Sequence, residues 1–219
     1  MTRTCIVAAK RTPQGRFLGE LSRRTALDLG VAAGRAALEG IGADRIDQTI
    51  VGNVLGAGVG MNVARQISLA LGVPLDRPAF TVNMMCASGL QAVVLATQAI
   101  AAGQAEVVLC GGTESMSNAP YLLQRARSGY RMGDGALIDC LLRDGLVDTS
   151  SGQHMALSAE RLAQHYGIDR AAQDAFALRS QQNTHRAYAE GRYQDELVPV
   201  DKLDRDEHPR PDTTLEQLA

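Results

Sequence analysis

Hydrophobic and polar positions in the first half of the chain alternate between two kinds of segment. Four short apolar runs are typical of buried strands, over residues 5–9, 46–55, 80–82 and 107–109. Apolar residues recur at helical spacing between these runs, over residues 25–38, 62–71 and 88–102. Strands that alternate with helices predict an α/β fold, in which a mostly parallel sheet is covered by helices on both faces.

The third predicted helix and the strand after it carry the residues that we expect to pack against the sheet. The inward stripe of this helix is predicted to be Leu90, Val93, Val94, Thr97 and Ala101. Gly111 and Gly112 end the next strand, and they predict close backbone packing there. We expect Glu114 to be buried and to orient neighbouring backbone N–H groups.

The pattern changes near Thr113. Residues 114–121 have the composition of an irregular loop, and no further buried strand is predicted. Helical patterning then covers residues 134–143, 155–166 and 170–191, and the segment from Val198 is loop-like. We therefore predict an α/β core over residues 1–117 and a helical lobe over residues 118–219, with the last strand of the sheet left without a partner.

Composition excludes several classes of function. The 219 residues are 45% hydrophobic and 21% charged, with a formal net charge of −2, which predicts a globular protein with a sizeable core. Basic clusters are short and not interleaved with aromatic residues, so nucleic acid is not an expected partner. The apolar run near the N-terminus is too short for a signal peptide or a membrane span, and we expect a cytoplasmic protein without a membrane partner.

The four cysteines indicate neither a disulfide framework nor a metal site. Cys5, Cys86, Cys110 and Cys140 are widely spaced, without a Cys-x-x-Cys pair or a His at metal-binding spacing. Cys86 differs from the others because it lies between a predicted strand and a predicted helix. Unpaired N–H groups and the positive end of the helix dipole favour a thiolate there. Cys86 is therefore a candidate nucleophile, although a small buried residue closing a turn would fit the same position.

Other candidate groups are weaker. A nucleophilic cysteine normally needs a base, and His154, after Gly152, is the most site-like histidine, whereas His165 and His185 lie on polar helical faces. The glycine cluster of residues 56–60 lacks the third glycine of a dinucleotide-binding fingerprint, so we expect a flexible connection there. A nicotinamide-dependent oxidoreductase remains an alternative on the α/β pattern alone.

Several stretches together resemble the thiolases, the acetyl-CoA acyltransferases. The matching segments follow one another in order over most of the chain: residues 82–90, 111–121, 130–134, 143–146, 173–180 and 206–215. The resemblance implies that Cys86 attacks the thioester of an acyl-CoA and becomes acylated. A second acetyl-CoA, deprotonated at its α-carbon, would then attack the acyl group and form a 3-oxoacyl-CoA, and thiolysis is the reverse reaction.

The resemblance also assigns the helical lobe. In thiolases this insertion, the loop domain, holds coenzyme A, which implies CoA as part of the substrate and no separate cofactor. The family positions that line the CoA channel match Leu146, His154, Met155, Arg210 and Gln217 in this sequence. Arg210 would meet the nucleotide end, where a guanidinium suits a phosphate or an adenine face. Residues 117–134 resemble the region through which thiolases form tetramers, so a homo-oligomer is expected.

The sequence departs from the thiolase pattern in three ways. Ala156 stands where thiolases usually have glycine after His-Met, and the stretch between Val200 and Asp206 is shorter than in most relatives. Thiolases are also nearly twice as long, and the segments with their general base and second catalytic cysteine have no match. We therefore expect the N-terminal portion of a thiolase with little activity as an isolated chain. The alternatives are a non-catalytic CoA-binding module or one subunit of a split thiolase.

Overall fold

A three-stranded parallel sheet forms the centre of the molecule in the computed structural model, which describes residues 4–219. Its strands are β1 (Gln48–Gly52), β2 (Ala79–Val82) and β3 (Val108–Gly112), in the order β2-β1-β3. Ile50 of β1 pairs with Phe80 on one side and Cys110 on the other. The predicted α/β class is confirmed, and residues 1–3 of the predicted first domain lie outside the described residues.

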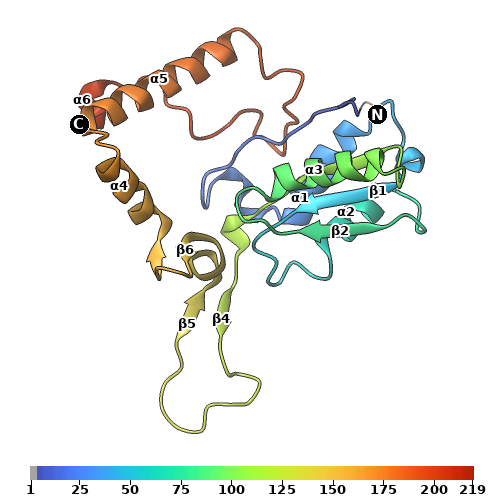
Figure 1. Ribbon diagram of the computed structural model, residues 1–219, viewed down its shortest axis with the longest axis horizontal. Helices are drawn as coiled ribbons and strands as arrows, with labels where there is room; N and C mark the ends of the chain where they lie inside the picture. Colours follow the sequence, from blue (N-terminus) through green and yellow to red (C-terminus); the bar gives the residue numbers. More distant parts are fainter. Residues whose placement is uncertain (1–3) are drawn as a thin grey trace.

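Helices cover both faces of this sheet, as predicted (Figure 1). On one face, α1 (Ala26–Ala37) and α2 (Val63–Ala70) pack against Val51. On the other face, α3 (Ser88–Ala101) packs against Ile50. Neighbouring residues of a strand point to opposite faces, so β1 contributes to two separate apolar clusters.

The predicted helix boundaries of α1 and α2 are confirmed because polar side chains cap their first turns. Thr25 and Asp28 form a reciprocal capping box, with the Asp28 N–H donating to Thr25 Oγ1 (3.1 Å). The Asn62 side chain accepts from the Arg65 N–H (3.2 Å) at the start of α2. These contacts are local in sequence, which is why the sequence pattern located both helices.

The predicted strand over residues 5–9 is wrong. These residues form no ladder, and Ile6 and Val7 are 77% and 76% exposed. A strand exists only where another strand pairs with its backbone, and within residues 4–219 none does so here. The sheet accordingly has three strands rather than four. A single bridge, Arg11 with Leu197, joins the end of this segment to the C-terminal part of the chain.

The predicted inward face of α3 is also wrong. Leu90 and Val94 are 69% and 40% exposed, whereas the buried positions are the small residues Ser88, Ala92, Ala96 and Ala99. This helix is apolar on most of its circumference, so the hydrophobic spacing did not distinguish its faces. The sheet selects the alanine face, with Leu95 packed beside it, because α3 lies close to the strands and small side chains fit best between them.

The second half of the chain begins with a protruding antiparallel ribbon (Figure 1). It pairs β4 (Tyr121–Leu123) with β5 (Leu137–Asp139), with Leu122 opposite Ile138. The helix predicted over residues 134–143 is therefore wrong for most of its length. Leu137–Asp139 pair across the ribbon instead, a pairing that local spacing does not reveal. Helical backbone begins only after β5, in a π-helix at Leu141–Leu146.

The remaining elements form the rest of the lobe. A short ribbon joins β6 (Val147–Asp148) to β7 (Gln153–His154), and the long helices α4 (Met155–His165) and α5 (Arg170–Ala189) agree with the prediction. The chain ends with α6 (Leu215–Leu218), and three short 3-10 helices lie at η1 (Glu20–Arg23), η2 (Ala43–Arg45) and η3 (Met116–Asn118). The domain division after residue 117 stays a prediction.

Candidate active site

Cys86 lies on a tight turn between β2 and α3, two residues before the helix begins. Its thiol is exposed. The Ala87 N–H donates to the Met84 carbonyl (3.2 Å) and the Ser88 N–H to the Met85 carbonyl (2.9 Å), and Met85 has a positive φ of 52°. A bulky residue rarely adopts this left-handed conformation, which is typical of turns at functional sites. The turn thus presents Cys86 at the carboxyl edge of a parallel sheet, where α/β proteins place their ligands.

Ser88 and Asn83 hold this turn in place. Ser88 Oγ is buried; it accepts from the Met84 N–H (2.9 Å) and donates to the Met85 carbonyl (2.6 Å). Asn83 Oδ1 accepts from the Met85 N–H (2.9 Å). These positioning roles were not predicted from the sequence. Their local signal was an Asn and a Ser on either side of a strand-to-helix turn, since both residues bond to nearby backbone.

Three glycines let the start of α3 lie directly on the strand ends. A Cβ added to Gly112 would lie 3.2 Å from Gly89 Cα, and one added to Gly52 would lie 2.7 Å from Gly89 N. Larger residues would therefore lift α3, and Cys86 with it, away from the sheet. The predicted packing role is confirmed for Gly112, whereas a Cβ at Gly111 would meet open space.

Glu114 joins the ends of β1 and β3 beside this helix start. Its carboxylate accepts from the Val54 N–H (2.8 Å), the Leu55 N–H (3.2 Å) and the Asn53 amide (2.8 Å). The predicted role of orienting backbone N–H groups is confirmed, with Glu114 half-buried rather than fully buried. A carboxylate with three donors stabilises the loop that follows β1.

The predicted CoA-contacting residues fall into two groups in the structure. Leu146, His154 and Met155 lie together because β6 and β7 pair Val147 with His154. The His154 ring caps α4, with Nδ1 accepting from the Ala156 N–H (3.1 Å), so Nε2 carries the proton of the neutral ring. Leu146 is half-buried, whereas His154 and Met155 are exposed and free to meet a ligand.

Arg210 and Gln217 form the second group, beyond α5. The Arg210 N–H donates to Gln181 Oε1 of α5 (2.7 Å), and its guanidinium side is exposed. Gln217 Oε1 accepts from the Thr214 N–H (3.0 Å) in a capping box, which leaves the amide NH₂ for other partners. Within residues 4–219, no hydrogen bond or strand pairing joins either group directly to Cys86.

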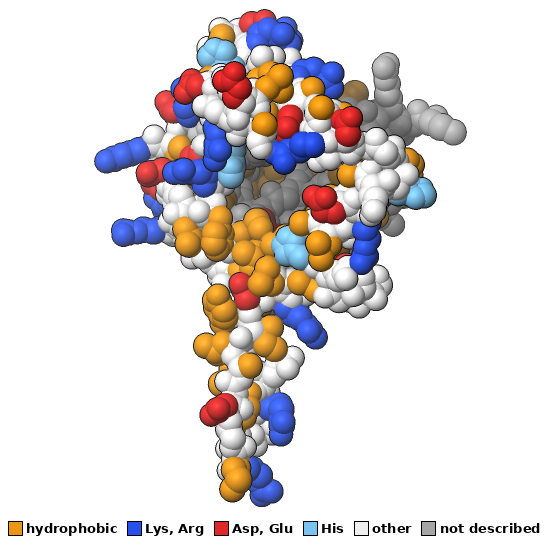
Figure 2. Space-filling model, turned by 90° about the vertical axis from the view of Figure 1, so that its left-hand side faces the viewer, with side chains coloured by type: hydrophobic (Ala, Val, Ile, Leu, Met, Phe, Trp, Pro, Cys, Tyr) orange, Lys and Arg blue, Asp and Glu red, His pale blue; other side chains and the backbone are white. Residues whose placement is uncertain are grey.

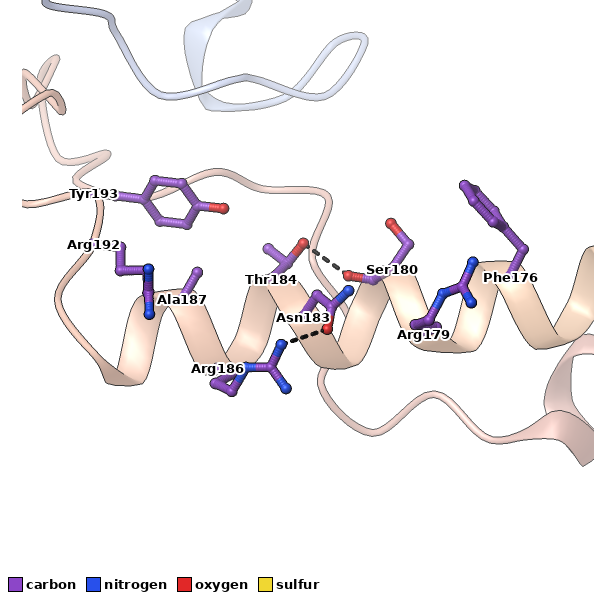
Figure 3. A pocket seen from close by; sticks show the side chains of 9 residues that line it. All are labelled: Phe176, Arg179, Ser180, Asn183, Thr184, Arg186, Ala187, Arg192 and Tyr193. Carbon is purple, nitrogen blue, oxygen red and sulfur yellow. Dashed lines mark hydrogen bonds between the residues drawn. The ribbon is translucent and has the colours of Figure 1, made fainter.

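A cavity of about 530 Å³ lies elsewhere, along α5 (Figure 3). None of the predicted site residues lines it. Two of its arginines, Arg186 and Arg192, face Glu190 at 4.0 and 2.5 Å, and Arg179 lies over the Phe176 ring. Because these cations already have partners, the cavity is a polar surface groove rather than an evident anion site.

Other kinds of site have no support in the described part of the chain. Residues 4–219 contain no cluster of three or more His, Cys, Asp or Glu side chains that could hold a metal ion. They also contain no helix of the length and apolar character that a membrane crossing needs. Residues 56–60 form a loop of turns and bends between β1 and α2.

The fold and the site describe an α/β protein with an exposed cysteine on the tight turn before a helix that covers its parallel sheet. This chain belongs to the thiolase family, because residues 4–219 match the family model "Thiolase, N-terminal domain". It is 46% identical to the acetyl-CoA acetyltransferases of Allochromatium vinosum and Escherichia coli, over 98% and 100% of this chain.

A solved structure agrees with these sequence relatives. Human mitochondrial 3-ketoacyl-CoA thiolase, determined in complex with CoA, is 43% identical and superposes with a TM-score of 0.92 over 97% of this chain. The chain spans 57% and 58% of the two bacterial relatives and 55% of the human chain. The predicted family and fold are therefore confirmed, and the comparison covers about half of each relative.

Proposed function

We propose that this chain carries the acyl-accepting cysteine of a thiolase-type acyl-CoA acyltransferase. The observation that supports the proposal is the exposed Cys86 thiol on its strained turn, at the start of α3 and at the carboxyl edge of the sheet. Its relatives carry the name acetyl-CoA acetyltransferase, and the human relative was determined with CoA. Thioester exchange suits such a residue, because one thioester replaces another at little cost in free energy.

The proposed reaction has two steps. The Cys86 thiolate attacks the carbonyl carbon of an acyl-CoA, the bond from that carbon to the CoA sulfur breaks, and the CoA thiolate takes up a proton. Acetyl-CoA then gives up one α-proton to a base, which balances the proton taken up by CoA, and the resulting carbanion attacks the acyl carbon. A carbon–carbon bond forms, the bond from the acyl carbon to the Cys86 sulfur breaks, and the Cys86 thiolate is released. The positive end of the α3 dipole favours negative charge on the sulfur and on the oxyanion of each tetrahedral intermediate.

We further propose that the lobe binds the CoA portion of the substrate. Leu146, His154 and Met155 offer an apolar side chain, an imidazole Nε2–H and a thioether in one place. Arg210 offers an exposed guanidinium for phosphate or for an adenine face, and Gln217 an amide. No separate cofactor is needed, since the acyl group enters already activated as a thioester.

Intact-mass measurement of the chain after incubation with acetyl-CoA tests this proposal. We expect the mass of one acetyl group to be added, and peptide mapping to place it on Cys86. The Cys86→Ser variant should not retain the thioester, whereas Cys5→Ser, which removes another exposed thiol, should be acetylated like the wild type. Binding of CoA without acetylation would instead support the non-catalytic CoA-binding module, and acetylation of Cys5 alone would refute the role of Cys86.

We also propose that the β4–β5 ribbon joins copies of this chain. The ribbon projects from the molecule and carries apolar side chains together with arginines (Figure 2). Its exposed large apolar residues are Tyr121, Leu123, Tyr130, Met132 and Leu137. Apolar surface of this kind favours association. Light scattering should show an oligomer that the Leu137→Lys variant weakens, and a monomeric wild type would refute this proposal.

A further inference from the structure

Arg11 lies at the centre of a set of contacts between the N-terminal segment and the C-terminal part of the lobe. Its guanidinium donates two hydrogen bonds to the Asp206 carboxylate (2.7 and 3.1 Å) and one from Nε to Glu196 (2.7 Å). The same guanidinium lies 5.2 Å from the centre of the Tyr193 ring. We call Arg11, Tyr188, Tyr193, Glu196 and Asp206 the Arg11 cluster.

Asp206 is the most fully satisfied member of this cluster. Its side chain is 11% exposed and also accepts from the Gln14 N–H (2.7 Å) and the Tyr188 hydroxyl (2.8 Å). The Tyr188 oxygen in turn accepts from the Asp206 N–H (2.9 Å). The Arg11–Asp206 pair is bidentate, partly buried and supported by further hydrogen-bond donors. It therefore fixes the position of Asp206 in a way that an isolated surface ion pair does not.

The contacts continue along the chain from Asp206 to Arg210. The Glu207 carboxylate accepts from the Arg16 N–H (2.8 Å), and the Glu207 N–H donates to the Gln14 carbonyl (3.0 Å). At the other end, the Arg210 N–H donates to Gln181 of α5 (2.7 Å). Residues 206–210 are therefore held by the N-terminal segment on one side and by α5 on the other.

We propose that Arg11 is a positioning residue for the recognition of the CoA nucleotide. By holding Asp206 and Glu196, it fixes residues 206–210 and α5 relative to each other, and so sets where the Arg210 guanidinium lies. Arg11 itself contacts Asp206, Glu196 and Tyr193 and acts through Arg210. This inference rests on the proposed function, because it takes Arg210 to meet the nucleotide end of CoA.

The test compares two acyl donors on the full chain. Acetylation of Cys86 is measured by mass spectrometry with acetyl-CoA and with S-acetyl-N-acetylcysteamine, a thioester that lacks the nucleotide. We expect Arg11→Gln to raise the acetyl-CoA concentration giving half-maximal rate about 5- to 10-fold, while the rate with the short thioester stays within about 2-fold of wild type. Arg11→Lys keeps the positive charge but not the planar guanidinium that binds a carboxylate with two nitrogens. Its half-maximal acetyl-CoA concentration should lie between those of the wild type and Arg11→Gln.

Two further variants separate positioning from general stability. Arg24→Gln removes the ion pair of Arg24 with Asp201, which also joins the first part of the chain to its C-terminal part. This variant should leave the rate of Cys86 acetylation unchanged with both donors. The double variant Arg11→Gln/Arg210→Ala should need no higher acetyl-CoA concentration for its half-maximal rate than Arg210→Ala alone. The reason is that both changes remove the same interaction, that of Arg210 with the nucleotide. Additive losses, or equal losses with both donors, would overturn the inference.

Failure of the proposed function would be seen separately. If neither donor acetylates wild-type Cys86, the proposed acyltransferase role is refuted. Calorimetry with CoA alone then tests Arg11, since Arg11→Gln should weaken CoA binding about 5- to 10-fold. Equal CoA affinity of the wild type and the variant, or no CoA binding by the wild type, would overturn the positioning role.

Discussion

The Glu114 carboxylate, just beyond β3, accepts a hydrogen bond of 2.8 Å from the backbone N–H of Val54, just beyond β1. This contact joins two strand ends that are 60 residues apart in the sequence. It lies at the same edge of the sheet as Cys86. The strand ends below the candidate nucleophile are thus held by a charged acceptor rather than by apolar packing alone.

Replacing Glu114 by Gln should destabilise the fold. The amide has one acceptor oxygen instead of two, and its NH₂ group would face N–H donors that now lack a partner. We expect a loss of about 2 to 3 kcal/mol in the free energy of unfolding, measured by urea denaturation. Glu106→Gln, at an exposed position before β3, is the control and should change stability by less than about 0.5 kcal/mol. Equal stability of the two variants would contradict the role of Glu114.

Adding one methyl group at Gly52 should disturb the start of α3. The new Cβ would lie 2.7 Å from Gly89 N, a distance that only a shift of the helix can relieve. We expect Gly52→Ala to cost about 2 to 3 kcal/mol and to change the alkylation rate of Cys86. Gly111→Ala is a matched control, because the same methyl would meet open space there. Similar costs for both variants would show that close packing at Gly52 is not the reason.

The four thiols should react with iodoacetamide in an order set by burial and charge. Burial, with the carboxylate of Asp144 next in effect, raises the pKa of Cys140 to about 11, so about one molecule in a thousand carries that thiolate at pH 8. Burial also raises the pKa of Cys110. Peptide mapping should find Cys5 and Cys86 labelled first, and all four labelled in urea. Early labelling of Cys140 in the folded protein would contradict this order.

Asp47 should make stability depend on pH in the acid range. Its carboxylate accepts from the Val107 and Glu106 N–H groups (3.0 and 2.8 Å), and these bonds hold its pKa below the ordinary 3.8. A lowered pKa means that the stabilisation is present above about pH 4 and disappears as the pH falls through the folded-state pKa. Asp47→Asn should therefore lose about 2 kcal/mol at pH 7 and much less near pH 2.

Urea denaturation at a series of pH values measures this effect. Asp76→Asn, at the residue immediately before Arg77 and with a side chain 79% exposed, serves as the control and should follow the wild-type curve. A constant difference between Asp47→Asn and the wild type from pH 7 to pH 2 would contradict the proposed linkage.

The sequence predicted those elements whose signals are local. Thr25 and Asn62 cap their helices through residues only three positions away, so the pattern of polar and apolar residues located α1 and α2. The alternation of strands and helices predicted the α/β class for the same reason. Cys86 was recognised from its neighbours on both sides, and the turn that presents it involves only residues 83–88.

Tertiary structure decided what depends on distant partners. Ile6 and Val7 have the composition of a strand but no ladder within residues 4–219, and Leu90 lies outside because the sheet accepts the alanine face of α3. The Arg11 cluster joins residues about 190 positions apart, and no local pattern could have indicated it. Backbone pairing, the choice of a helix face and long-range ion pairs all depend on which surfaces the fold brings together. The sequence alone therefore determined the family and the candidate nucleophile, and the structure determined how that nucleophile is held.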